Sequence, residues 1–379
     1  MPVITPPDPA LMVLNSLTLD EKIGQLLIIG FTEPNPSVRA LSLIQDHKVG
    51  GVILFRRNYN DFAGAISLNN QLHLWNQDHP LPLFIGIDEE GGTVSRLPAG
   101  GTRFPDAHVL GKIGDVALTE KVAETMAKEL KALGVNMNFA PVLDIAISPT
   151  SPLARRSFGP EASLVAAQGV SFVAGHKKQG IIAVPKHFPG HGDTATDSHG
   201  KLPRILVNRE TFFARELAPF RAAILSGIDA LMVGHVSYPN IDPSGVPATR
   251  SKIILTEILR RELLFNGLII TDEIEMVAFL AQEKLLAPAI VQSLLAGVDI
   301  FIVGHTYSVQ LEVIAAIKQA VVSGHLTIER IDQSVLRIIK VKQKYKLKEA
   351  TFLEIEQARS TFGTVENKAV LDEVRKRSK

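Results

Sequence analysis

Residues 186–203, KHFPGHGDTATDSHGKLP, concentrate the side chains of this sequence that could do chemistry. The stretch combines three of the chain's 11 histidines with two aspartates: His187, His191, Asp193, Asp197 and His199. Imidazoles and carboxylates placed this densely could bind a metal ion or could transfer protons. The residues between them decide which chemistry is favoured.

A metal site is the first interpretation. His187 and His191 are four positions apart, which is the spacing of a zinc-binding pair on a helix. Pro189, Gly190 and Gly192 exclude a helix at this point. Barrel hydrolases that use a metal also place His-x-His at the end of an early strand, and the sequence contains no such pair. We expect no metal and no cofactor.

Proton transfer is the second interpretation. Asp197 and His199 lie two positions apart in TDSHG, between Gly192 and Gly200. A carboxylate this close orients an imidazole and raises its pKa, so that the ring can donate a proton near neutral pH. Together with an anionic nucleophile, such a pair could cleave a glycosidic bond with retention. Asp272 is a good candidate for the nucleophile, although periodicity alone leaves Asp272 and its neighbour Glu273 both open.

Eight short apolar runs supply the elements that must position these residues. They lack polar alternation, as expected of strands that are buried on both faces, and they span 23–31, 50–55, 82–90, 135–145, 181–188, 228–235, 267–274 and 298–304. Amphipathic stretches such as DVALTEKVAETMAKELKALG and RETFFARELAPFRAAILSG separate them. No G-x-G-x-x-G follows the first run and no Walker A loop occurs, so an open doubly wound sheet is disfavoured. The pattern predicts a single (β/α)₈ TIM-like barrel.

Five of these runs end in polar residues. A single polar residue after a strand could be a helix cap, but the series is long: Asp88 and Glu89, Asp144, Lys186 and His187, His235, and Asp272 and Glu273. The C-terminal ends of barrel strands share one mouth, where the active sites of such barrels lie. The series therefore predicts a common site.

Composition narrows the function classes further. The formal net charge is +1, and the one dense basic run is the terminal VRKRSK, so nothing indicates nucleic-acid binding. The absence of cysteine excludes disulfides and thiolate sites. The first residues do not form a secretory signal, and Pro288 and Asp299 interrupt the apolar stretch 285–304, which we expect to form a helix, a turn and a strand. We expect a cytoplasmic protein without a membrane span.

Longer motifs resemble those of a known family. Over residues 17–345 the chain is similar to glycoside hydrolase family 3, and within it to the bacterial β-N-acetylglucosaminidase branch that trims cell-wall fragments. The resemblance rests on LTLDEKIGQLLIIGF, IDEEGGTVSRL, NFAPVLDI, RSFG, KHFPGHGDTATDSH, MVGH, PATRS and ITDEIEM. The combination of KHFPGHG with DSH is the most specific of these motifs.

The resemblance implies a role for each matching residue. Asp272 of ITDEIEM is the implied nucleophile, and Asp197 with His199 is the implied acid/base pair on a loop. Five residues are implied to hold sugar hydroxyls: Asp88, Arg96, Arg156, Lys186 and His187. We expect His191 and Asp193 to hold the shape of the loop, and His235 and Asp144 to support the site. The family's usual SDD or TDA reads TDE here, so Glu273 departs from the pattern.

The resemblance also implies an organisation and a reaction. It implies a catalytic barrel over residues 1–345 and a short C-terminal helical extension over 346–379, without the second domain of many family 3 glucosidases. The expected function is retaining hydrolysis of β-linked GlcNAc from GlcNAc-1,6-anhydroMurNAc-peptides by a monomer, with a small-molecule carbohydrate as its partner. The alternatives are a β-N-acetylglucosaminide phosphorylase, a β-glucosidase, a non-catalytic sugar-binding protein and, more distantly, a metal-dependent hydrolase.

Overall fold

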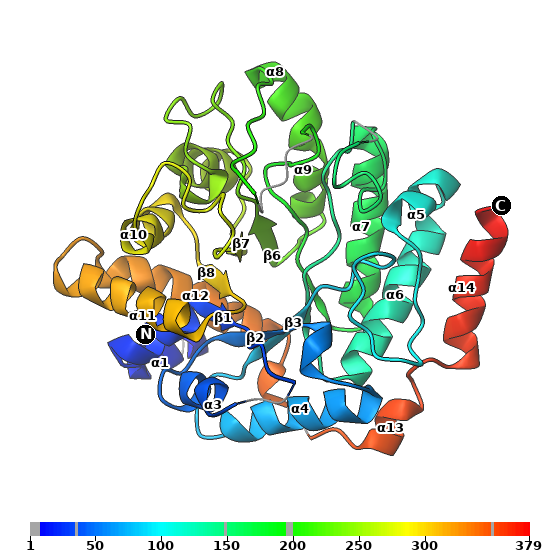
Figure 1. Cartoon of the computed structure of the whole chain (residues 1–379), viewed down its shortest axis with the longest axis horizontal. Coiled ribbons are helices and arrows are strands. Elements are labelled where there is room, and N and C mark those ends of the chain that lie inside the picture. The colour runs from blue at the N-terminus through cyan, green and yellow to red at the C-terminus, as the bar shows by residue number, and fades with distance from the viewer. Residues whose placement is uncertain (1–7, 35–36, 148–149, 195–199, 350–351) are drawn as a thin grey trace, which may run out of the picture.

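The computed structural model of the chain describes residues 8–34, 37–147, 150–194, 200–349 and 352–379 (Figure 1). Two predicted site residues, Asp197 and His199, lie outside these ranges. Their proposed roles therefore rest on the sequence.

Within the described residues, eight parallel strands form one sheet in the order β5-β4-β3-β2-β1-β8-β7-β6. They are β1 (Leu27–Ile29), β2 (Gly51–Leu54), β3 (Phe84–Ile87), β4 (Met137–Asn138), β5 (Ile182–Ala183), β6 (Ala230–Val233), β7 (Leu268–Glu273) and β8 (Ile300–Val303). Each strand lies within one of the predicted apolar runs, and all strand residues except the last two of β7 are buried. The arrangement is a nearly closed barrel, which confirms the predicted (β/α)₈ fold.

The residues 185–188 close the barrel between β5 and β6, and we call them the closing segment. Phe188 donates its backbone N–H to the carbonyl oxygen of Met232 at 2.8 Å, and Met232 donates to Pro185 at 2.9 Å. Gly234 in turn donates to Phe188 at 2.9 Å. Single parallel bridges pair Val142 with Lys186 and Phe188 with Val233. The stretch that carries Lys186 and His187 is thus part of the barrel wall.

Runs four and five form shorter strands than their apolar spans, 135–145 and 181–188, indicate. Pro141 and Pro185 interrupt the two runs, and proline has no N–H to donate to a ladder. The carbonyl oxygens of both prolines still accept hydrogen bonds: Pro141 from the backbone N–H of Lys186 and Pro185 from that of Met232, each at 2.9 Å. The chain therefore continues along the barrel as single bridges rather than as regular strands.

Helices surround the sheet and connect its strands (Figure 1). The α-helices of the described residues are α1 (Pro9–Ser16), α2 (Leu19–Gln25), α3 (Val38–Gln45), α4 (Phe62–Trp75), α5 (Ala107–Ile113), α6 (Val116–Ala132), α7 (Ala162–Lys178), α8 (Arg209–Thr211), α9 (Ala218–Leu225), α10 (Leu286–Ala296), α11 (Tyr307–Val322), α12 (Ile328–Lys344), α13 (Ile355–Arg359) and α14 (Val365–Arg377). Two π-helices, Phe212–Glu216 and Ile253–Glu262, and three short 3₁₀-helices complete the helical elements of these residues. A capping box starts α2, because Thr18 accepts from the backbone of Glu21 at 3.3 Å while the Glu21 carboxylate accepts from the backbone of Thr18 at 2.8 Å.

The stretch 285–304 folds as expected into a helix, a turn at Gly297 and a strand, namely α10 and β8. Buried α10 residues such as Ile290 and Leu294 join the core. Across the part of the chain that the structure describes, no helix has the length and apolarity needed to cross a bilayer.

A buried carboxylate, Glu129 of α6, connects the C-terminal segment to the barrel. Its Oε1 accepts from the backbone of Gly363 at 3.0 Å and from Nδ2 of Asn367 at 2.8 Å. Its Oε2 accepts from the backbone of Thr102 at 2.8 Å, in the loop that follows β3. Figure 1 shows α14 alongside α6. The segment is helical as expected, and it is bound to a loop close to the predicted site.

Candidate functional site

A cavity of about 530 Å³ opens at the C-terminal ends of the strands. Six of the eight predicted site residues line it: Asp88, Arg96, Arg156, Lys186, His187 and Asp272. Asp88 follows β3 directly, Lys186 and His187 belong to the closing segment, and Asp272 is the second-to-last residue of β7. The parallel strands thus bring together residues that are far apart in the sequence, as the strand-end pattern predicts.

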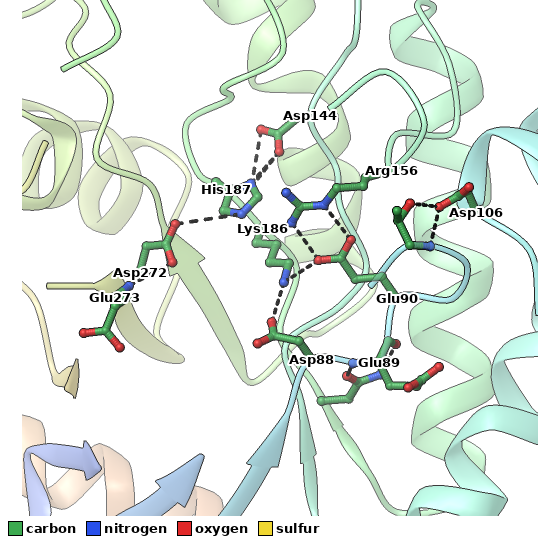
Figure 2. Close-up of polar contacts among 12 residues, drawn as sticks. Asp88, Glu89, Glu90, Asp106, Asp144, Arg156, Lys186, His187, Asp272 and Glu273 are labelled. Carbon is green, nitrogen blue, oxygen red and sulfur yellow. Dashed lines mark hydrogen bonds and ion pairs between the residues drawn. The ribbon is translucent and has the colours of Figure 1, made fainter. Parts of the chain in front are cut away.

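Lys186 lies at the centre of an ion-pair network on one side of the cavity (Figure 2). Its Nζ donates to Asp88 Oδ1 at 2.7 Å and to Glu90 Oε1 at 2.6 Å. Arg156 holds the same Glu90 with two hydrogen bonds, from Nε at 2.8 Å and from Nη2 at 2.7 Å. We call these four residues the charged grip. Its paired charges have fixed directions, which suits recognition of neighbouring sugar hydroxyls.

Burial and charge act in opposite directions on the pKa values of the grip. Burial alone would raise the pKa of Glu90, but Lys186 and Arg156 outweigh it and lower that pKa to about 2. Burial would lower the pKa of Lys186, yet Asp88 and Glu90 raise it overall. Both groups are therefore charged near neutral pH.

Glu90 was not among the predicted site residues. The sequence contained a usable signal, because Glu90 lies two positions after Asp88 and side chains alternate with period two in extended chain. Glu89, which we noted at the end of the third run, points elsewhere. It is buried, and its Oε2 accepts from the backbone of Arg96 at 2.7 Å and of Leu97 at 3.2 Å. Burial raises the pKa of Glu89 to about 7.

Asp144, His187 and Asp272 form a row beside the grip (Figure 2). Asp144 is fully buried, and its Oδ2 lies 2.6 Å from Nδ1 of His187. The other ring nitrogen, Nε2, faces Asp272 Oδ2 at 3.9 Å. Because Asp144 accepts a hydrogen bond from Nδ1–H of His187, it orients the imidazole so that Nε2 faces Asp272. Asp144 does not line the cavity, which agrees with a supporting role.

The structure distinguishes Asp272 from Glu273. Burial would raise the pKa of Asp272, but His187 and then His235 outweigh it, so the pKa falls below its ordinary value. Burial raises the pKa of Glu273 to about 8. Figure 2 shows the Glu273 carboxyl on the side of Asp272 that is away from His187 and Lys186. Asp272 is thus an ionised carboxylate next to the grip, which fits a nucleophile.

The remaining predicted residues take supporting places. Both ring nitrogens of His235 are engaged, Nδ1 with Thr249 Oγ1 at 3.1 Å and Nε2 with the carbonyl oxygen of Glu273 at 3.0 Å. His191 donates its backbone N–H to Asp144 Oδ1 at 2.6 Å and is one of the residues that line the cavity. Asp193 is paired with Arg215. Within the described residues, no group of three or more His, Asp or Glu side chains is arranged to hold a metal ion.

Replacing Glu90 with alanine is expected to lower the free energy of unfolding by roughly 3–5 kcal/mol, because it leaves half-buried Arg156 without its carboxylate partner and buried Lys186 with Asp88 alone. Denaturant unfolding at pH 7 would measure the change. Glu257→Ala is the matched control, since it breaks an exposed pair with Arg261 and should cost at most about 0.5 kcal/mol.

The pH dependence of stability gives an independent check on the same pair. The folded pKa of Glu90 is about 2, against an ordinary value of 4.5. The stabilisation by ionised Glu90 is therefore complete above about pH 4.5 and is lost as the pH falls toward 2. The difference in unfolding free energy between wild type and Glu90→Ala should shrink over that range. A loss under about 1 kcal/mol at pH 7 would contradict the network.

Comparisons with known proteins agree on one family. The family model described as "Glycosyl hydrolase family 3 N terminal domain" matches residues 18–341. Beta-hexosaminidase A of Pseudoalteromonas piscicida is 34% identical over 86% of this chain and 61% of its own length. This chain therefore spans less than two thirds of that relative.

Solved structures show the same likeness. A family 3 beta-N-acetylglucosaminidase from Paenibacillus sp. str. FPU-7 superposes with a TM-score of 0.90 at 39% identity, covering 96% of this chain and 69% of the other. A beta-glucoside phosphorylase bound to 2FGlc superposes with a TM-score of 0.87 at 26% identity, covering 96% of this chain and 66% of the other.

Proposed function

Because this chain belongs to glycosyl hydrolase family 3, we propose that its cavity hydrolyses the bond between a terminal β-linked N-acetylglucosamine and its leaving group. The observation that carries the proposal is the ionised Asp272 beside the charged grip, at the mouth of the barrel. The choice of N-acetylglucosamine is supported by the names of the similar proteins, a beta-hexosaminidase and a beta-N-acetylglucosaminidase.

The proposed reaction has two steps with retention at C1. The grip and Arg96 hold the sugar hydroxyls, and an Asp272 oxygen forms a bond to C1 while the bond from C1 to the leaving oxygen breaks. His199, oriented by Asp197, gives its proton to that oxygen. His199 then takes a proton from water, whose oxygen bonds to C1 as Asp272 leaves. The roles of Asp197 and His199 rest on the DSH motif.

The finer parts of the proposal concern the substrate and its setting. We propose GlcNAc-1,6-anhydroMurNAc-peptides as the natural substrates, and a monomer acting in the cytoplasm as the working form. The proposed division of the chain is a catalytic barrel over 1–345 and an extension over 346–379. The contacts of Glu129 with Gly363 and Asn367 support an extension that packs on the barrel.

Release of 4-nitrophenol tests the proposal. We expect kcat/KM for 4-nitrophenyl β-N-acetylglucosaminide to exceed that for the β-glucoside by about tenfold or more, because a site that binds an amide discriminates against an analogue without it. Faster release from the β-glucoside would instead support a β-glucosidase, and no release from either substrate would support a sugar-binding protein. We expect the rates to be unchanged after treatment with a metal chelator. A loss of activity after chelation would indicate a metal-dependent hydrolase.

The same assay run with phosphate addresses the phosphorylase alternative, which the structural likeness to a beta-glucoside phosphorylase keeps in view. We expect free N-acetylglucosamine as the product in both buffers. Formation of a sugar 1-phosphate, with a rate that rises with phosphate, would replace hydrolysis by phosphorolysis in the proposal.

A further inference from the structure

The C-terminal segment contacts the loop that follows Arg96, and the proposed reaction gives this contact no role. Figure 1 shows α13 next to α4 and α14 next to α6. The contact is made by residues 361–367, which run from the turn after α13 into α14, and we call them the contact segment. They lie against residues 97–102, which follow Arg96 directly and which we call the Arg96 loop.

The polar part of the contact is centred on Glu129, whose side chain is fully buried. Its Oε1 accepts from Gly363 and Asn367 of the contact segment, as described above, and also from Oγ1 of Thr102 at 2.6 Å. Its Oε2 accepts from the backbone N–H of the same Thr102. One buried carboxylate therefore holds the contact segment and the Arg96 loop together. A shift of either one removes a hydrogen bond from buried polar atoms, which is costly.

The two segments also meet through their backbones. Gly363 has a φ of +64°, and a Cβ at this position would lie 2.0 Å from the carbonyl oxygen of Gly100. A Cβ at Gly101 would lie 2.8 Å from Cζ of Phe362 and 3.2 Å from Cβ of Leu97. Only glycine permits so close an approach. The Phe362 ring therefore packs directly on the Arg96 loop, with Gly101 between the ring and Leu97.

The Arg96 loop connects this contact to Arg96 over a few residues. Gly101 donates its backbone N–H to the carbonyl oxygen of Pro98 at 3.3 Å, which closes a turn, and Leu97 is fully buried. On the other side of the loop, Glu89 accepts from the backbone of Arg96 and Leu97. The backbone of Arg96 is thus set from two directions, by Glu89 and by the loop, while its side chain lines the cavity.

We propose that the contact segment is a positioning element for Arg96, so that binding of the sugar depends on residues that follow the barrel in the chain. The inference rests on the proposed function, in which Arg96 holds sugar hydroxyls. An arginine contact depends on the direction of its donors, and small displacements of a positioning group weaken it strongly. Asn367 and Phe362 act through Arg96 rather than on the sugar, because neither of them lines the cavity.

A contact that only stabilised the fold would have a different consequence, and Asn70 provides the comparison. Asn70 is half-buried in α4 and joins the same C-terminal segment through Leu353. Its Nδ2 donates to the carbonyl oxygen of Leu353 at 2.9 Å, and its Oδ1 accepts from the backbone N–H of Leu353 at 2.9 Å. This contact fixes the segment to α4 rather than to the Arg96 loop. Asn70→Ala is therefore the matched control for Asn367→Ala.

The experiment measures N-acetylglucosamine as a competitive inhibitor of nitrophenol release from 4-nitrophenyl β-N-acetylglucosaminide. Its inhibition constant reports the contacts to the sugar separately from bond cleavage. We expect Asn367→Ala and Phe362→Ala each to raise this constant about threefold to tenfold, the range for substitutions along a coupled network. Asn70→Ala should change it by less than about twofold. Denaturant unfolding of each variant shows that the comparison is made between folded proteins.

Arg96→Ala distinguishes action through Arg96 from an independent effect. It should raise the inhibition constant at least as much as Asn367→Ala or Phe362→Ala, and adding either change to Arg96→Ala should alter the constant by less than about twofold. Independent effects would multiply instead, and that result would overturn the inference. So would a smaller effect of Arg96→Ala alone, or equal effects of Asn70→Ala and Asn367→Ala. Failure of the proposed function is distinct, because wild type would then release no nitrophenol.

Discussion

Asp272→Ala is expected to reduce turnover by about 10⁴-fold or more while leaving the fold intact. Losses of that size follow when the nucleophile of a covalent mechanism is removed. The Asp272 side chain lines the cavity rather than the apolar core, so its loss creates no core void. Steady-state rates would show the loss, and an unfolding curve close to that of wild type would show that the protein is still folded.

Covalent labelling identifies the nucleophile directly. A 5-fluoro glycosyl donor should form a long-lived ester with Asp272, and peptide fragmentation should locate it within GLIITDEIEM. Glu273 is the main alternative candidate for the nucleophile, since it is adjacent to Asp272 in the chain and lines the same cavity. A label on Glu273 would refute the assignment to Asp272.

His199→Ala is expected to slow hydrolysis of a natural disaccharide by about 10²–10⁴-fold, the usual contribution of a general acid. An unactivated sugar oxygen needs that proton in order to leave, whereas an activated aryl oxygen leaves without help. The first step on an aryl substrate should therefore suffer much less than the first step on the disaccharide. The measurement is the ratio between the rate reduction that His199→Ala causes on the disaccharide and the reduction that it causes on the aryl substrate.

The second step gives a further signature of the same group. Without a base to activate water, the glycosyl-enzyme should accumulate and a burst of nitrophenol should appear. Azide needs no base to attack C1, so added azide should accelerate the breakdown of the glycosyl-enzyme. Asp197→Ala should show a milder form of this pattern, because Asp197 only orients the imidazole. Equal losses on both substrates together with lowered thermal stability would mean that His199 is structural.

Much of the fold was predictable because parallel barrel strands are buried on both faces. That burial makes each strand an uninterrupted apolar run, and all eight runs contain a strand. The strand-end rule also placed Asp88, Lys186, His187 and Asp272 in one cavity. His305, which also lines this cavity, follows the eighth run in the same way, and the rule could have included it.

Other features depend on contacts that one strand's pattern does not contain. The choice between Asp272 and Glu273 is an example, because the pairing of β7 with β8 shifts register between Ile270 and Glu273. Glu273 is then fixed by the backbone N–H of Gly304, which donates to its Oε2 at 2.6 Å. Gly304 is 31 residues away from Glu273, so the local periodicity of the β7 sequence contains no information about this contact.

The closing segment gives the barrel an unusual coupling between its architecture and its ligand. The backbone of residues 185–188 completes the wall toward β6, and the side chains of Lys186 and His187 face the cavity. Any opening of the wall at this point displaces both side chains. By thermodynamic linkage, a sugar that binds them more tightly in the closed arrangement than in the open one stabilises the closed arrangement by that difference in binding free energy. Bound substrate therefore stabilises the barrel wall that surrounds it, and opening of the wall is least favourable while the site is occupied.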